Sequence, residues 1–191
     1  MSESAVRTRR WSRVEYDKLI ETGILGPGDK IELLGGQLCV SEPQSSPHAR
    51  AISLGLEAIR QALAPGWHVR VQMPIALDDE SEPEPDLAVV AGGPRDYADH
   101  PPRPALVVEV ADSSLALDRE HTGSLYARAR LPEYWIVNLV DRVLEVYRES
   151  QPDAGAPYGW AYRVLLTLGP DEHVTPLAAP SARIHVADLL P

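Results

Sequence analysis

The sequence predicts an α/β (α+β) domain in which short buried strands alternate with amphipathic helices. Valine-rich runs at residues 87–90 and 106–111 are bounded by proline or glycine, which is typical of buried strands. Apolar residues at helical spacing over residues 52–63 predict a helix. The chain has 191 residues, of which 44% are hydrophobic, and this suffices for the core of one domain.

Length and composition also bound the organisation of the chain. We expect residues 1–10 to form a flexible tail and residues 11–191 to form a single domain. The tail lacks the apolar stretch of a secretory signal, and no run approaches the roughly 18 apolar residues of a membrane span. Cys39 is the single cysteine, which excludes an internal disulfide and suits a reducing cytoplasm. We therefore expect a cytoplasmic protein with no membrane partner.

The net charge of −10 opposes broad, nonspecific attraction to nucleic acid, which depends on basic surface. It does not exclude a local basic groove. Nor does it exclude a metal-dependent site that is acidic before the cation binds.

The first half of the chain predicts two helices and a hairpin. A capping box that starts at Ser12 predicts a helix to about residue 22. Residues 31–34 and 37–40 predict a hairpin around two glycines. Ser46 is the predicted N-cap of the next helix, with Pro47 at its first position.

The second half predicts strands around one long helix. Residues 112–114 cap a helix over residues 115–130, on which Asp118, Thr122 and Tyr126 share a face because they recur every four residues. We expect an acidic, solvated turn at residues 78–84. The further predicted strands are residues 67–77, 133–138, 143–147, 160–168 and 174–177.

Two carboxylates in this pattern are candidate residues of a metal-binding or catalytic site. Glu109 lies inside a predicted buried strand, where an unpaired charge costs several kcal/mol unless a cation, an arginine or protonation compensates it. Asp86 stands 23 residues earlier, at the start of the preceding strand. Two such carboxylates suit a hard cation such as Mg²⁺, which activates water and polarises phosphate. The alternative, a turn aspartate and a glutamate paired with an arginine, stays open at this point.

Two further polar residues are ambiguous from their local sequence. Glu32 lies in the predicted hairpin, where an outward-facing strand residue is the better local interpretation. His48 lies in the first turn of a predicted helix, and a lone histidine there is more often structural or exposed than part of a site.

Five motifs together resemble a known family. They are Glu84-Pro85-Asp86-Leu87, Val107-Val108-Glu109-Val110-Ala111-Asp112-Ser113-Ser114, Asp118, Leu125-Tyr126-Ala127-Arg128-Ala129 and Pro132-Glu133-Tyr134-Trp135-Ile136-Val137-Asn138. In order and spacing they resemble the Uma-type putative restriction endonuclease family of the PD-(D/E)XK nuclease superfamily. The resemblance extends over nearly the whole chain.

The resemblance implies a restriction-endonuclease-like fold, with a mixed central sheet flanked by helices. It implies that Asp86 and Glu109 are catalytic residues that bind the metal, Mg²⁺ or Mn²⁺, and that Glu32 is a supporting catalytic acid. It implies DNA as the partner. Assembly as a homodimer is an expectation that it leaves open.

The chain departs from the family pattern at its lysine. The superfamily places a lysine at the position of Ala111, and the Uma-type family places one at the position of Thr122. The only lysines here are Lys18 and Lys30. Losing a group that neutralises developing charge commonly costs 10²–10³-fold in rate.

Three hypotheses therefore remain open. The leading one is a Mg²⁺-dependent endonuclease that hydrolyses DNA phosphodiester bonds, either impaired or using Arg119 or His121 in place of lysine. The alternative is a non-catalytic binding or regulatory protein with the nuclease fold. The third is a structural homo-oligomer whose acids form ordinary ion pairs.

Overall fold

A computed structural model of the chain describes residues 8–41 and 43–191. Most of the predicted tail, residues 1–7, lies outside the described residues. At its end, Arg9 pairs with Glu15 and Arg10 pairs with Glu80. The last residues of the predicted tail thus contact the domain.

The described chain forms a central sheet, two small hairpins and helices on both sides. In chain order the elements are α1 (Arg13–Glu21), β1 (Ile31–Leu34), β2 (Gln37–Val40), α2 (Ser46–Ala62), β3 (Trp67–Val71), β4 (Leu87–Ala91), β5 (Leu106–Ala111), α3 (Leu115–Leu117), the π-helix η1 (Asp118–Thr122), α4 (Gly123–Arg128), β6 (Glu133–Asn138), β7 (Val143–Pro152), β8 (Trp160–Leu168), β9 (His173–Val174), β10 (Ile184–His185) and the 3₁₀-helix η2 (Val186–Leu189). Among these helices, none has the length and apolarity that a membrane span requires.

The central sheet is mixed, as predicted. Its six strands follow the order β3-β4-β5-β6-β7-β8. Neighbouring strands run antiparallel except β5 and β6, which are parallel and are joined by the helical segment from α3 to α4. Parallel neighbours require such a crossover connection. The helical segment predicted over residues 115–130 therefore covers one face of the sheet.

The two faces of the sheet carry separate apolar clusters. One face packs against α2 and the C-terminal segment, through Ile59, Val108 and Trp135 among others. The opposite face contains Val107, Ala111 and Tyr126. Because side chains alternate along a strand, Glu109 faces the second cluster, as its position between Val108 and Val110 predicted.

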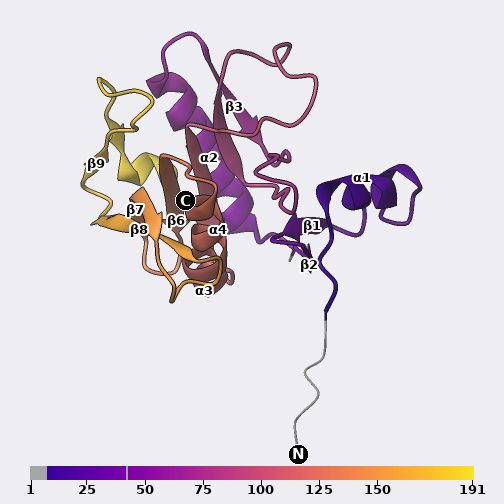
Figure 1. The fold of residues 1–191 in the computed structure, drawn as a ribbon. Helices are drawn as coiled ribbons and strands as arrows, with labels where there is room; N and C mark the ends of the chain where they lie inside the picture. The colour runs from indigo at the N-terminus through magenta and orange to yellow at the C-terminus, as the bar shows by residue number, and fades with distance from the viewer. Residues whose placement is uncertain (1–7, 42) are drawn as a thin grey trace, which may run out of the picture.

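The hairpin β1–β2 forms a separate sheet beside the central one. The backbone N–H of Glu82 donates to the Leu33 carbonyl at 2.7 Å, and the Tyr16 hydroxyl donates to the Ile31 carbonyl at 2.6 Å. Figure 1 shows α1 and this hairpin together at one side of the molecule, away from β7 and β8. The hairpin therefore reaches the sheet near the start of β4.

Several predicted boundaries are wrong, each for a local reason. The strand expected over residues 67–77 ends at Val71, because Gln72 adopts a left-handed backbone (φ 47°). The turn expected to be solvated buries Glu82, which pairs with Arg13. Of the strand expected over residues 174–177, only Val174 is in a strand, β9, which it forms with His173 and which pairs with β10.

The two long helices also differ from their predictions in detail. Ser45, not Ser46, caps α2, and its hydroxyl accepts from the His48 N–H at 3.3 Å. The helix over residues 115–130 contains a π-helical turn at Asp118–Thr122 and ends at Arg128. π-Turns inside α-helices occur frequently at functional sites.

A fully buried carboxylate anchors β6 to β7. Glu133 accepts from the Arg148 guanidinium at 2.5 Å, from the Trp135 indole at 2.9 Å and from the Leu177 N–H at 2.7 Å. Removing the cation of a buried pair leaves an uncompensated charge, which costs about 3–5 kcal/mol.

Arg148→Ala should therefore destabilise the fold by about 3 kcal/mol or more, measured as the free energy of unfolding in urea. Arg163→Ala is the matched control on the neighbouring strand, because its pair with Glu149 is exposed. Exposed pairs contribute about 0–1 kcal/mol. Equal losses in the two variants would contradict this account of Glu133.

Candidate active site

Asp86 and Glu109 lie opposite each other where the ladder between β4 and β5 ends. The last paired positions are Leu87 and Val108, and Asp86 and Glu109 are the next two in register. The Asp86 N–H donates to Oε2 of Glu109 at 3.1 Å, and the Val110 N–H donates to Oδ2 of Asp86 at 2.8 Å. Beyond the last paired positions, side-chain carboxylates thus accept the backbone N–H bonds that strand carbonyls accept within the ladder.

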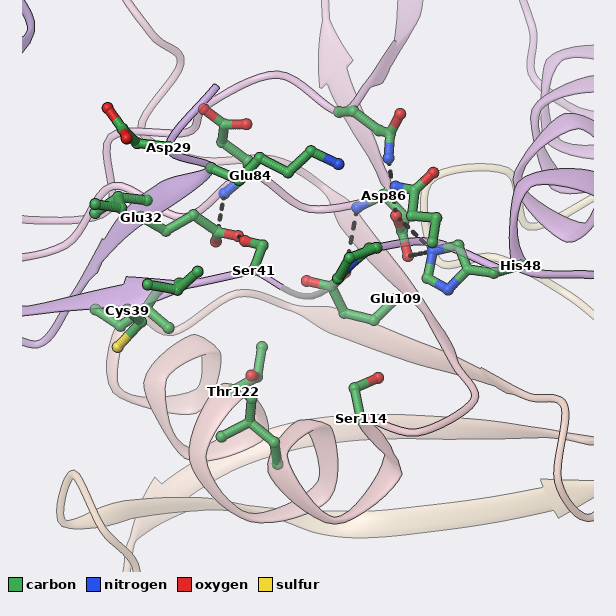
Figure 2. A pocket seen from close by; sticks show the side chains of 18 of the residues that line it. Asp29, Glu32, Cys39, Ser41, His48, Glu84, Asp86, Glu109, Ser114 and Thr122 are labelled. Atoms are coloured by element: carbon green, nitrogen blue, oxygen red, sulfur yellow. Dashed lines mark hydrogen bonds and ion pairs between the residues drawn. The ribbon is translucent and has the colours of Figure 1, made fainter. Parts of the chain in front are cut away.

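Three further side chains hold these carboxylates in place. Nε2 of His48 lies 3.1 Å from Oδ1 of Asp86, and the Gln72 amide donates to the same oxygen at 3.4 Å. The Tyr126 hydroxyl donates to Oε1 of Glu109 at 2.6 Å. Figure 2 shows His48 pointing at Asp86 from one side of the pocket. Both acids are therefore oriented before any ligand binds.

The environment of Glu109 disfavours its charge. Burial, followed by the negative charges of Asp86 and Asp118, raises the pKa of Glu109 well above its ordinary value. Among the described residues, no arginine or lysine lies within ion-pair distance of Glu109. The arginine pairing left open by the sequence is therefore not what the structure contains.

Asp86 favours the charged form of His48, whereas it disfavours the charged form of Glu109. Burial lowers the pKa of His48, but the hydrogen bond and the charge of Asp86 outweigh it, so the pKa lies above its ordinary value. An imidazolium at this position partly balances the acidic pair.

Glu32 joins the same pocket from the hairpin. Its carboxylate accepts from the Ser41 hydroxyl and, at 3.0 Å, from the Glu84 N–H. Burial raises the pKa of Glu32. The local interpretation of an outward-facing strand residue is therefore wrong, because the side chain lines the pocket that Asp86 and Glu109 also line.

The π-helical turn forms the opposite wall of the pocket. Asp118 and Thr122 are both buried and both line the pocket. The Ser114 hydroxyl donates to Asp118 at 2.6 Å, while burial raises the pKa of Asp118 to about 6. Figure 2 shows Ser114 and Thr122 on this helical segment, across the pocket from Glu109.

The pocket as a whole is strongly acidic. Its cavity volume is about 1040 Å³, large enough for a nucleotide-sized group. Seven carboxylates line it: Asp29, Glu32, Glu84, Asp86, Glu109, Asp112 and Asp118. Lys30 is the one lysine or arginine among the described lining residues. Such a wall attracts cations.

The donor set fits a magnesium-type cation better than a structural metal cage. Within residues 8–41 and 43–191, no group of three histidine, cysteine or acidic side chains is arranged to hold a metal ion. Mg²⁺ is usually bound through one or two carboxylates, with waters and substrate phosphates completing its shell. Asp86 and Glu109 would supply two oxygen ligands to such a cation.

Comparison with known proteins identifies the family. The profile of the putative restriction endonuclease family Uma2 matches residues 13–183. The chain belongs to this family. No curated protein matches it.

A solved structure shares the fold of this Uma2 family member. It is the crystal structure of a putative nuclease belonging to DUF820 from Anabaena variabilis, with a TM-score of 0.66 and 16% sequence identity. The match covers 88% of this chain and 94% of that one. The likeness confirms the restriction-endonuclease-like fold expected from the sequence motifs.

The two residues suggested as substitutes for lysine in this Uma2 member lie outside the pocket. Arg119 donates to Glu145 at 2.6 and 3.1 Å and lies 3.6 Å from Asp141. His121 packs edge-on against Tyr158, with 6.4 Å between ring centroids. Neither lines the cavity.

Sequence reasoning missed His48, Gln72 and Ser114 as residues of the site. Gln72 had no recognisable signal, because only its left-handed backbone turns it toward Asp86. His48 had one weak signal, its place in the first turn of a helix. Ser114 was recognised only as a cap, yet in the structure its hydroxyl bonds Asp118.

The raised pKa of Asp118 predicts a pH-dependent stability. Because the folded pKa of about 6 exceeds the ordinary 3.8, this group favours folding below pH 4, and its contribution is lost as the pH rises through 6. From pH 5 to 7 the loss is about 1 kcal/mol. Asp118→Asn cannot ionise, so urea unfolding should show a correspondingly smaller decline over this range.

Ser114→Ala is a useful companion, because it removes the hydrogen bond that favours the charged form of Asp118. The decline between pH 5 and 7 should then be steeper than in the wild type. If Asp118→Asn follows the wild-type pH dependence, Asp118 does not titrate in this range.

Proposed function

We propose that this protein is a Mg²⁺- or Mn²⁺-dependent endonuclease that hydrolyses phosphodiester bonds in DNA. The observation that carries the proposal is the facing pair Asp86 and Glu109 at one end of the β4–β5 ladder, inside an acidic pocket. Family membership supports nucleic acid as the substrate.

Each residue of the site has a distinct part in this proposal. Asp86 and Glu109 would bind the cation, which supplies an activated water and neutralises charge on the phosphate when it is present. The His48 ring holds Asp86 in place through its hydrogen bond, and the Tyr126 hydroxyl does the same for Glu109. Glu32 would assist as an acid that retains or accepts a proton, since burial raises its pKa.

A non-catalytic binding or regulatory protein is the second candidate. Ala111 is fully buried in the apolar cluster beneath the site, and Thr122 is neutral. Neither position supplies the positive charge that phosphodiester hydrolysis commonly uses. In this case the protein would retain metal and DNA binding without turnover.

Plasmid nicking tests the leading proposal. With Mg²⁺ or Mn²⁺, the wild type should convert supercoiled DNA to the open circular form, and both Asp86→Ala and Glu109→Ala should lower the rate at least 10²-fold. Glu149→Ala, an exposed acid on β7 away from the pocket, is the control and should cleave normally.

Isothermal titration with Mn²⁺ separates the two candidates. Folded wild type that binds Mn²⁺ and DNA but leaves the plasmid intact in every form would support the non-catalytic protein. If Asp86→Ala and Glu109→Ala both bind Mn²⁺ as the wild type does, the assignment of Asp86 and Glu109 as ligands is wrong.

Thr122→Lys should raise metal-dependent cleavage, by roughly tenfold or more, because it places a positive charge on the pocket wall. His121→Lys is the matched control, since it adds the same charge one residue away on an exposed side chain outside the pocket. Initial rates of plasmid nicking measure the effect. No gain over the wild type in a folded, metal-binding Thr122→Lys variant would show that Thr122 does not face the reacting phosphate.

DNA as the partner, a homodimer and a cytoplasmic location remain predictions. Gel filtration combined with light scattering measures the assembly directly.

A further inference from the structure

The negative charges of the acids that line the pocket repel a phosphate. Seven carboxylates line the cavity, and a phosphodiester brings another negative charge into it. A bound cation at Asp86 and Glu109 offsets part of this repulsion. The remaining acids, such as Glu32 and Glu84 on the hairpin side, still face any DNA that enters.

Few basic side chains line the described pocket. Three arginines that do not line it pair with acids that do not line it either: Arg13 with Glu82, Arg119 with Glu145, and Arg128 with Asp78. His48 is paired with Asp86. Among the described residues, Lys30 lines the pocket and forms no ion pair within 4.0 Å.

The backbone holds Lys30 at the rim of the pocket. Its carbonyl accepts from the Ser41 N–H at 2.8 Å, and the Ser41 hydroxyl donates to Glu32. Lys30 also has a left-handed backbone, with φ of 47°, which is uncommon for a residue with a side chain. Such conformations persist where the surrounding structure enforces them, and they cluster at functional sites.

We propose that Lys30 is the residue that contacts the DNA phosphate in this pocket, in place of a lysine on β5 or on the π-helical turn. The inference rests on the proposed function. A lysine is a compact point charge on a long flexible stem, so it can approach a phosphate from a different wall of the same cavity. It directly precedes the hairpin, whereas Ala111 lies at the end of β5 and Thr122 on the opposite wall of the pocket.

Binding measurements test the contact without requiring cleavage. A short fluorescein-labelled DNA of mixed sequence, single-stranded or duplex, is titrated in Ca²⁺ over a range of salt. Lys30→Ala should weaken binding about tenfold and reduce the slope of log affinity against log salt by roughly 0.7–0.9, the value for one lost phosphate contact. Lys30→Arg keeps the charge and should retain most of the slope.

Lys18→Ala is the matched control, because Lys18 is the only other lysine and lies exposed on α1 outside the pocket. It should bind DNA and depend on salt as the wild type does. If Lys30→Ala and Lys18→Ala behave alike, Lys30 is not the phosphate contact.

Lysine footprinting on the wild type provides a second measurement that does not depend on the folding of a variant. Brief acetylation followed by mass spectrometry reports the two lysines separately. DNA with Ca²⁺ should slow acetylation of Lys30 several-fold and leave Lys18 unchanged. Equal rates with and without DNA at Lys30 would overturn the inference.

The outcomes for Lys30 and for the proposed function are distinguishable. If the wild type cleaves DNA but DNA does not slow acetylation of Lys30, the inference about Lys30 is wrong and the proposed endonuclease activity is still supported. Protection of Lys30 and a reduced salt slope without cleavage support the inference and favour the non-catalytic protein. Wild type that neither binds nor protects in any DNA form overturns both.

Discussion

The two hydrogen bonds that join Asp86 to Glu109 and to Val110 are the constraint on which the site depends. The Asp86 N–H donates to the Glu109 carboxylate, and the Asp86 carboxylate accepts from the next N–H along β5. These bonds satisfy backbone donors at the end of a buried ladder and simultaneously fix two acids on one face of the sheet. The position of both carboxylates thus follows from the pairing of β4 with β5.

Apart from Asp86, which pairs with His48, the buried acids of the described residues fall into two groups. Three of them pair with arginine: Glu82 with Arg13, Glu133 with Arg148 and Glu145 with Arg119. Glu109 and Asp118 pair with no arginine or lysine: Glu109 accepts from the Tyr126 hydroxyl and the Asp86 N–H, and Asp118 accepts from the Ser114 hydroxyl. A buried carboxylate without a cation retains its proton or recruits a cation from solution. The acids without a basic partner, Glu109 and Asp118, both line the pocket, as the proposed cation site requires.

The sequence predicted the features that depend on short-range patterns. Valine-rich runs located β4 and β5, and alternation placed Glu109 on the correct face. It could not predict that Glu32 turns into the pocket, because that requires the hairpin to dock beside Glu84, 52 residues away in the chain. The π-turn was also invisible, since Asp118, Thr122 and Tyr126 fit an α-helical period equally well. Local propensity carries no information on such long-range contacts.

A catalytic charge is defined by its position in space, and the pocket has walls from three separate segments of the chain. The hairpin and the residue before it contribute Glu32 and Lys30, the β4–β5 end of the sheet contributes Asp86 and Glu109, and the π-turn contributes Thr122. A lysine on any wall faces the same cavity, so its absence from two sequence positions does not by itself decide activity. What decides it is whether the charge reaches the phosphate. In our proposal Lys30, directly before the hairpin, supplies this charge on its flexible stem, without a residue at either expected position.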